Sequence, residues 1–335
     1  MKRSCIFLLL LLMCIRMDNE CISAGRITND KPYWGFYAHK LINRLAVFSL
    51  PPEMIIFYKP HIRFLEDHAV DPDKRRYAVK GEAPKHYIDL DRYPTDSLEQ
   101  VAFYWKDAVK MFSGDTLMKR GIVPWQIVRV KYQLTKAFAE RNHGKILKFS
   151  ADLGHYIGDA NVPLHTTSNY NGQLTGQHGI HGFWESRIPE LAANRYDFFV
   201  GKASYLSNPQ QTAWQAVINA HKAVDSVLSF EKLLNESIQA DKKYSFEERN
   251  GQTVKVYSKA FSLAYEKKLG GQIERQLRAS IKMVADFWYT AWIDAGQPSL
   301  IDLSDKHHLD SLEKTLQEES LLWQKKKIFS RPHEN

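Results

Sequence analysis

Residues 145–160 read Lys145-Ile-Leu-Lys-Phe-Ser-Ala-Asp-Leu-Gly-His-Tyr-Ile-Gly-Asp-Ala160. Apolar residues recur every three or four positions, as on a helix that buries one side. They are Ile146, Phe149, Leu153, Tyr156 and Ile157. His155 and Asp159 are four positions apart, so on a helix they point the same way. The stretch therefore predicts a buried helix that carries two polar groups close together.

Most of the chain after residue 25 shows the same helical periodicity, and strand patterns are few. Further helices are expected over residues 38–49, 96–112, 124–141, 209–234 and 257–295. Pro124 favours a helix start, and Gly270-Gly271 is expected to break or bend the last helix. Residues 252–257 alternate weakly and fit either a strand or the start of that helix. We therefore expect an all-α fold, a single-domain multi-helix bundle.

The beginning of the chain has the pattern of a secretory signal peptide. Lys2 and Arg3 precede an apolar run that is too short to span a membrane, and Ser23-Ala24-Gly25 offers small residues for cleavage. The expected divisions are a signal peptide (1–25), an all-α domain (26–297) and a charged extension (298–335). The mature chain is expected to be secreted or periplasmic and to have no transmembrane segment.

The cysteine content and the net charge limit which bonds, metal ligands and partners the chain can have. Cys5, Cys14 and Cys21 all lie in the expected signal peptide, so the mature chain has no thiol for a disulfide or a zinc site. A lipid anchor on Cys14 or Cys21 is an alternative that the preceding residues favour less. The net charge is +8, or +7 after cleavage, which favours anionic partners such as nucleic acid or phospholipid headgroups. A charge of this size is also explained by solubility alone.

A second pair repeats the spacing of His155 and Asp159. His181 and Glu185 are four positions apart, and His165 lies between the two pairs. Imidazoles and carboxylates are the ligands that zinc accepts when no thiolate is offered. One such pair alone is better explained by an ion pair or a core hydrogen bond, but together they predict a metal site.

The order and spacing of these residues resemble one superfamily. The motifs are Trp34-Gly-x-x-x-His39, Asp71, His86-Tyr-Ile-Asp89, His155-Tyr-Ile-Gly-Asp159, Pro163-Leu-His165 and His181-x-x-Trp-Glu185. This pattern resembles the superfamily that joins the bacterial zinc-dependent phospholipases C with the single-strand-specific zinc nucleases of fungi and plants. The resemblance extends to about Pro298 and includes the long aromatic-rich helix with Trp288 and Trp292.

This resemblance implies two to three zinc ions in a cleft of an all-α fold. The implied ligand sets are Asp71, His86, His155 and Asp159 for one ion, His165, His181 and Glu185 for a second, and His39, Asp159 and the backbone of Trp34 for a third. Asp159 would bridge two ions. Asp71 has rivals in Asp67 and Asp73, and its 15-residue separation from His86 favours it. His178 lacks a carboxylate four residues on, so we expect it to be a surface residue of the loop.

One position departs from the family pattern. In the family the tryptophan is the mature amino terminus, and its α-amino group binds the third zinc. Here Trp34 follows Lys31-Pro32-Tyr33, nine residues beyond the expected cleavage after Gly25. Either a second cleavage exposes Trp34, or the third zinc site is weaker, completed by water, or absent.

Clustered zinc suits the hydrolysis of a phosphate ester. It lowers the pKa of bound water toward ~7 and places positive charge on the attacked and leaving oxygens. We therefore expect an exported phosphodiesterase of the phospholipase C kind, in which a metal-bridging hydroxide attacks phosphorus and Asp71 and Asp159 serve the catalytic centre.

The substrate is left open between two classes. Tyr87 and Asp89 match positions that resemble a base-stacking aromatic and a base-contacting carboxylate in the nucleases. An aromatic and acidic wall also suits a choline-like cation in the phospholipases. Glu185 and the absence of disulfides favour a phospholipase, whereas the basic charge favours a single-strand-specific endonuclease or nucleotidase. A non-catalytic zinc-binding protein is the third alternative, and no protein partner is inferred.

Overall fold

The computed structural model describes residues 36–76, 79–93, 103–249, 251–303 and 321. All of them belong to one unit, residues 32–335. The expected signal peptide, Trp34 and most of the expected charged extension lie outside the described residues. Among the described helices, none has the length and apolar character that crossing a membrane requires.

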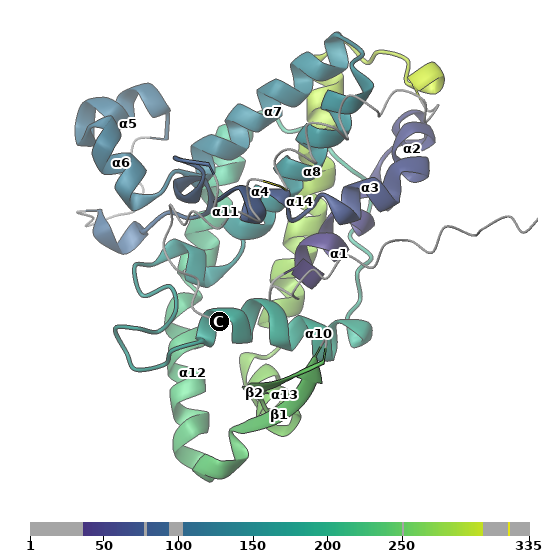
Figure 1. The fold of residues 1–335 in the computed structure, drawn as a ribbon. Coiled ribbons are helices and arrows are strands. Elements are labelled where there is room, and N and C mark those ends of the chain that lie inside the picture. The colour runs from purple at the N-terminus through teal and green to yellow at the C-terminus, as the bar shows by residue number, and fades with distance from the viewer. Residues whose placement is uncertain (1–35, 77–78, 94–102, 250, 304–320, 322–335) are drawn as a thin grey trace, which may run out of the picture. The chain divides into compact units, whose positions relative to one another are not determined.

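The described residues are mostly helical, which confirms the prediction of an all-α fold (Figure 1). The α-helices are α1 (Phe36–Ala46), α2 (Pro52–Tyr58), α3 (Ile62–Asp67), α4 (Asp71–Arg76), α5 (Trp105–Phe112), α6 (Gly114–Arg120), α7 (Val123–Ala139), α8 (His143–Ala160), α9 (Ile180–Gly182), α10 (Ile188–Ala192), α11 (Pro209–His221), α12 (Val224–Ser237), α13 (Lys259–Leu269) and α14 (Gln272–Asp294). A π-helical turn, Phe183–Arg187, joins α9 to α10. The strands are β1 (Tyr244–Arg249) and β2 (Gln252–Tyr257).

Short 3-10 helices join these elements. They are Val47–Ser49, Lys59–His61, Ala83–His86, Leu90–Arg92, Pro163–Thr166, Ala193–Arg195, Ala240–Lys242 and Ile301–Leu303. Two of them contain predicted metal ligands. Ala83–His86 contains His86, and Pro163–Thr166 contains His165. Proline in the first turn of each presets the backbone for such a tight helix.

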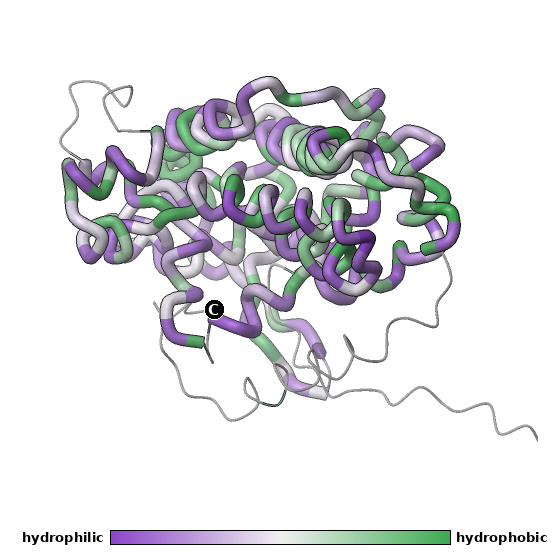
Figure 2. Tube along the Cα trace, turned by 90° about the horizontal axis from the view of Figure 1, so that it is seen from above, coloured by the Kyte–Doolittle hydropathy of each residue, from purple (hydrophilic) through white to green (hydrophobic). Residues whose placement is uncertain are grey.

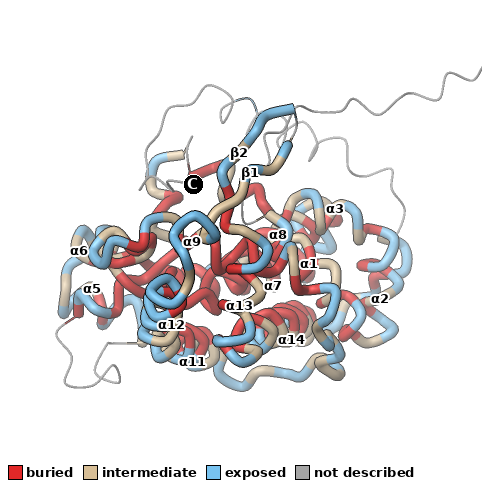
Figure 3. The backbone as a smooth tube through the Cα atoms, turned by 90° about the horizontal axis from the view of Figure 1, so that it is seen from below, coloured by how far each residue is buried: buried red, intermediate tan, exposed pale blue. Residues whose placement is uncertain are grey.

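Helices α7, α8 and α14 pack against one another, and α1 packs on α8 and α14 (Figure 1). In α8 every residue from Ser150 to Ala160 is buried, polar residues included. Figure 3 shows this run of buried backbone in the interior of the unit. Figure 2 shows hydrophobic and hydrophilic residues mixed along the chain, as amphipathic helices require. The predicted functional helix is therefore a central core helix.

Several predicted boundaries are confirmed for local reasons. Helix α8 ends at Ala160 as predicted but begins at His143, two residues before the predicted start, because the Asn142 side chain accepts a hydrogen bond from Lys145 N at 2.9 Å, as an N-cap does. Pro124 lies in the first turn of α7. Gly270 and Gly271 both adopt left-handed conformations with φ of 58° and 75°, and they separate α13 from α14 as predicted.

Two predicted helices are wrong in extent. Residues 209–234 form two helices, because the chain turns at residues 222–223 so that α11 packs on α7 while α12 packs on α13. The prediction of one helix over residues 96–112 is wrong at residues 103–104. The backbone of Tyr104 is extended, and α5 begins only at Trp105. The part of this prediction over residues 96–102 lies outside the described residues.

Residues 252–257 resolve to a strand rather than a helix start. Strand β2 pairs antiparallel with β1, with Tyr244 opposite Tyr257. The Arg187 side chain joins the hairpin to the π-helical turn, because its Nε donates to Tyr257 O at 3.1 Å and its Nη1 to Glu247 Oε2 at 3.1 Å. Phe183 stacks on Tyr257 at a centroid distance of 3.8 Å. The hairpin thus braces the segment that carries Glu185.

Candidate metal centre

Histidine and carboxylate side chains from separate elements converge in the core. Within the described ranges, three groups have ligand atoms that all lie within 4.8 Å of one another. The groups are His39, His155 and Asp159; Asp73, His86 and His155; and His165, His181 and Glu185. Imidazoles and carboxylates this close together have the composition and spacing of a metal centre.

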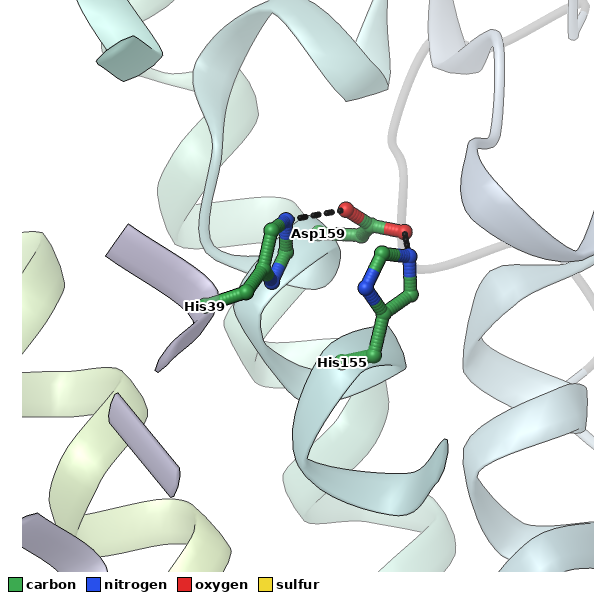
Figure 4. A group of neighbouring side chains, drawn as sticks. All are labelled: His39, His155 and Asp159. Carbon is green, nitrogen blue, oxygen red and sulfur yellow. Dashed lines mark ion pairs between the residues drawn. The ribbon is translucent and has the colours of Figure 1, made fainter. Parts of the chain in front are cut away.

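Asp159 lies at the centre of the first group. Its Oδ1 is 3.4 Å from His39 Nε2, and its Oδ2 is 3.2 Å from His155 Nε2. Figure 4 shows the carboxylate between the two imidazoles, with one oxygen directed at each. The two rings are stacked at a centroid distance of 4.1 Å. Asp159 Oδ2 is also 2.9 Å from His86 Nδ1, so this carboxylate links the first group to the second.

The second group contains Asp73 and not the predicted Asp71. Asp73 Oδ1 lies 3.7 Å from both His86 Nδ1 and His155 Nε2, and these two nitrogens are 3.0 Å apart. Asp71 instead bonds His68 Nδ1 at 2.6 Å and Lys74 Nζ at 3.1 Å. Both aspartates lie in α4, and two positions around a helix turn a side chain to a different face. The orientation of α4 therefore selects Asp73.

The third group matches the predicted set of His165, His181 and Glu185. His181 Nε2 is 2.8 Å from Glu185 Oε2 and 3.0 Å from His165 Nε2. Glu185 lies in the π-helical turn, and such turns occur often at functional sites. Its other oxygen, Oε1, is 3.1 Å from His39 Nε2. Glu185 therefore connects the third group to the first.

Backbone carbonyls fix the orientation of three imidazoles. His155 Nδ1 donates to Ala69 O at 2.9 Å, His165 Nδ1 to His86 O at 2.5 Å, and His181 Nδ1 to Tyr170 O at 3.1 Å. A carbonyl oxygen only accepts, so each Nδ1 carries the hydrogen and each ring directs its Nε2 inward, as a lone pair when the ring is neutral. In metal sites the second ring nitrogen is commonly held in this way.

The pKa values of four histidines in the centre are shifted in opposite directions. Burial alone lowers the pKa of a histidine, but Asp159 and the other carboxylates raise the pKa of His155 and of His165 to about 9. Burial dominates at His86, whose pKa falls to about 4, and it also lowers the pKa of His181. Positive charge is therefore strongly favoured beside Asp159, where a proton or a metal ion can supply it.

The two central carboxylates are held ionised. Burial alone would raise the pKa of Asp159 and Glu185, yet the adjacent histidines hold both pKa values well below the usual range. Each carboxylate is almost fully shielded from solvent, with residue exposures of 1% for Asp159 and 8% for Glu185. Buried charges of this kind are normally paired or bound to a metal.

Two small cavities border the ligands. One of about 10 Å³ is lined by His86, His165 and His181 together with Arg76, Tyr87, Leu164 and Tyr170. The other, of about 20 Å³, borders His39 and Glu185. A cavity needs ~10–15 Å³ to hold one water molecule. The residues present thus fit small inorganic ligands, and the donor set of nitrogen and oxygen without sulfur fits zinc.

Sequence reasoning missed two contributors to the centre. Gly158 of α8 faces His39, and a Cβ atom there would lie 2.8 Å from His39 Nδ1. Arg76 borders the smaller cavity, and its Nη1 donates to Asp73 Oδ1 at 3.2 Å. The three-residue spacing of Asp73 and Arg76 on a helix was a signal for their pairing, whereas nothing local marks Gly158.

The remaining predicted site residues are placed as follows. Tyr87 is buried and lines the smaller cavity, and its hydroxyl donates to Lys119 O at 3.4 Å. Asp89 is 3% exposed, and its backbone nitrogen donates to Arg120 O at 2.7 Å. His178 is exposed, as predicted for a residue of the loop. The Trp34 prediction lies outside the described residues.

No model of a known protein family matches this chain, and no curated protein sequence is significantly similar to it. The chemistry of the metal centre is therefore the basis on which a function can be proposed.

Proposed function

We propose that this protein is a zinc-dependent phosphoric ester hydrolase of the phospholipase C kind. The convergence of His155, His165 and His181 carries the proposal. When it is neutral, each ring presents an Nε2 lone pair toward buried carboxylates, because its Nδ1 is bound to a backbone carbonyl. Facing lone pairs and ionised carboxylates repel one another unless a cation lies between them. Such an arrangement favours binding of a divalent ion.

The ligand composition supports a catalytic metal more than a structural one. Structural zinc is usually closed by four ligands and often by thiolates, whereas catalytic zinc keeps a position for water. The third group offers His165, His181 and Glu185, which leaves such a position. Zinc bound here would supply a water of lowered pKa and positive charge for the phosphoryl oxygens.

The protein's own residues then have distinct roles. Asp159 and Glu185 provide the negative charge that holds several cations close together, since each contacts histidines of more than one group. The backbone acceptors at Ala69, His86 and Tyr170 keep the imidazoles in one tautomer.

For the substrate, we favour a phospholipid headgroup. The supporting features are Glu185 in place of aspartate and a mature chain without disulfides. The second candidate is single-stranded nucleic acid, because Tyr87, which lies beside His86 and His165, matches the position of a base-stacking aromatic in the nucleases that the sequence resembles. Both substrates contain a phosphodiester, so the same centre serves either.

The test combines metal content with hydrolysis. Elemental analysis of the purified protein is expected to find two to three zinc ions per chain. Chelation should abolish hydrolysis of bis-p-nitrophenyl phosphate, and added zinc should restore it. Parallel assays on phosphatidylcholine vesicles and single-stranded DNA identify the substrate class. Undiminished hydrolysis by the metal-free protein would refute the proposal, and bound zinc without any hydrolysis would indicate a structural role.

A further inference from the structure

A third, much larger cavity lies against α7. Its volume is about 750 Å³, within the range of roughly 300–1,000 Å³ that small-molecule sites occupy. Its lining comes from α5, α6, α7, the segment before His86 and the start of α11. It shares no lining residue with the two small cavities of the metal centre.

Aromatic rings form much of the wall. Trp105 and Trp125 contact edge to face at a centroid distance of 5.5 Å. Tyr132 lies about two helical turns after Trp125 along α7. Trp125 is 6% exposed and is fixed from behind by Trp214 at a centroid distance of 5.0 Å. Met118 and Ile122 complete the apolar part. Aromatic walls of this kind suit a flat ring, and Trp125 is the buried part of them.

Three polar atoms in this wall are buried without a hydrogen-bond partner among the described residues. They are Trp125 Nε1, Gln126 Oε1 and Gln210 Nε2. Trp125 and Gln126 are each only 6% exposed. Buried polar atoms of folded proteins are nearly always paired, so each such atom requires an explanation. Two of these atoms donate and one accepts, and none is open to the cavity, so a ligand that satisfies them must draw these side chains toward it and must both accept and donate.

The charged residues of the lining are all basic. Lys85 pairs with Glu82, and Lys136 lies 3.6 Å from Glu140 Oε1, while neither carboxylate lines the cavity. Arg129 forms no ion pair with any residue that the structure describes. A guanidinium beside aromatic walls is well suited to a phosphate or a carboxylate. The cavity therefore favours an anion.

We propose that this cavity binds a small anionic molecule with a planar ring that both donates and accepts hydrogen bonds. The ring would lie against Trp125 and Trp105, its polar edge would meet Gln126 and Trp125 Nε1, and its anionic group would meet Arg129. The proposal is independent of the metal centre and of its function. It assigns recognition to this cavity and no chemical step.

The fluorescent probe 8-anilinonaphthalene-1-sulfonate tests the site in the zinc-loaded protein, since it has flat rings, an N–H donor and a sulfonate. We expect saturable binding that Arg129→Gln weakens at least fivefold. Lys268→Gln, which removes an exposed cation of α13 outside the cavity, is the matched control and should leave binding unchanged. Equal binding by both variants would overturn the proposal.

A second variant separates binding from folding. Gln126→Leu removes an unpaired buried oxygen, so we expect it to keep or raise the melting temperature while it weakens probe binding severalfold. Competition defines the ligand class: adenosine monophosphate should displace the probe at least tenfold better than adenosine or decanoate. This displacement should survive His165→Ala, which disrupts the metal centre only. Equal displacement by adenosine or by decanoate would refute the anionic ring that we propose.

Discussion

The imidazole of His39 occupies the space that a side chain at position 158 would need. A Cβ atom on Gly158 would lie 2.8 Å from His39 Nδ1, and one turn earlier a Cβ atom on Gly154 would lie 1.7 Å from Asn43 Oδ1. The Asn43 amide in turn donates to Leu65 O and Ala151 O, each at 3.2 Å. Two glycines four residues apart therefore let α1 approach α8 closely enough to bring His39 to Asp159.

Gly158→Ala should consequently displace His39. Overpacking of a dense core typically costs about 1–3 kcal/mol, and here the displaced group is a proposed ligand. We expect the variant to lose zinc from the group of His39 and Asp159 while it keeps the other groups, as elemental analysis can measure. Gly114→Ala is the matched control, because no atom lies within 4 Å of a Cβ atom at position 114. Full zinc content in Gly158→Ala would contradict the close approach.

Asp73→Asn and Asp71→Asn form a second matched comparison. Asp73 faces His86 and His155, whereas Asp71 faces His68 and Lys74. We expect Asp73→Asn to lower zinc affinity and phosphodiesterase activity at least about tenfold, by analogy with changes next to metal ligands. Asp71→Asn should instead affect mainly thermal stability. The opposite ranking in a zinc titration would restore the assignment that the sequence favours.

Asp159→Asn should have the largest effect on the centre. This carboxylate contacts His39, His86 and His155, and its replacement leaves those imidazoles without their shared negative charge. We expect metal and activity to be lost together, because the metal supplies both the activated water and the positive charge for the phosphoryl oxygens. His178→Ala, on the exposed loop, is the control and should change neither. Retained zinc in Asp159→Asn would show that the carboxylate is not a ligand.

Acid stability should depend on Glu82. Burial would raise the pKa of this carboxyl, but Arg75 and Lys85 lower it from 4.5 to about 2. A depressed carboxyl pKa adds stability that is present above pH 4.5 and lost as the pH falls toward 2. The shift corresponds to at most about 3 kcal/mol, since one pKa unit is about 1.4 kcal/mol.

Glu82→Gln should therefore lower the free energy of unfolding at pH 7 and flatten its decline between pH 4.5 and 2. Denaturant melts across this range measure both effects. Glu53→Gln, at an exposed carboxyl of α2, is the comparison and should leave the pH profile unchanged. If Glu82→Gln declines as steeply as the original protein, another carboxyl is responsible.

Local patterns were sufficient for much of this protein. The periodicity of residues 145–160 predicts the helix α8, because residues three and four positions apart share one helical face, but burial of every side from Ser150 to Ala160 comes from the surrounding helices. Likewise, the four-residue spacing of His181 and Glu185 predicts that their side chains meet, as they do at 2.8 Å. Pro124 and Gly270-Gly271 mark helix boundaries through their own backbone preferences.

Other features depend on contacts between distant segments. Residue spacing favours Asp71 over Asp73, but only the packing of α4 decides that Asp73 faces His86 and His155. The turn at residues 222–223 exists because α11 and α12 pack on different helices, and β2 exists because β1 pairs with it. His39 reaches Asp159 only because α8 lacks side chains at positions 154 and 158. Residue spacing specifies what can meet within one helix, whereas the meeting of separate helices depends on close packing, which no single segment contains.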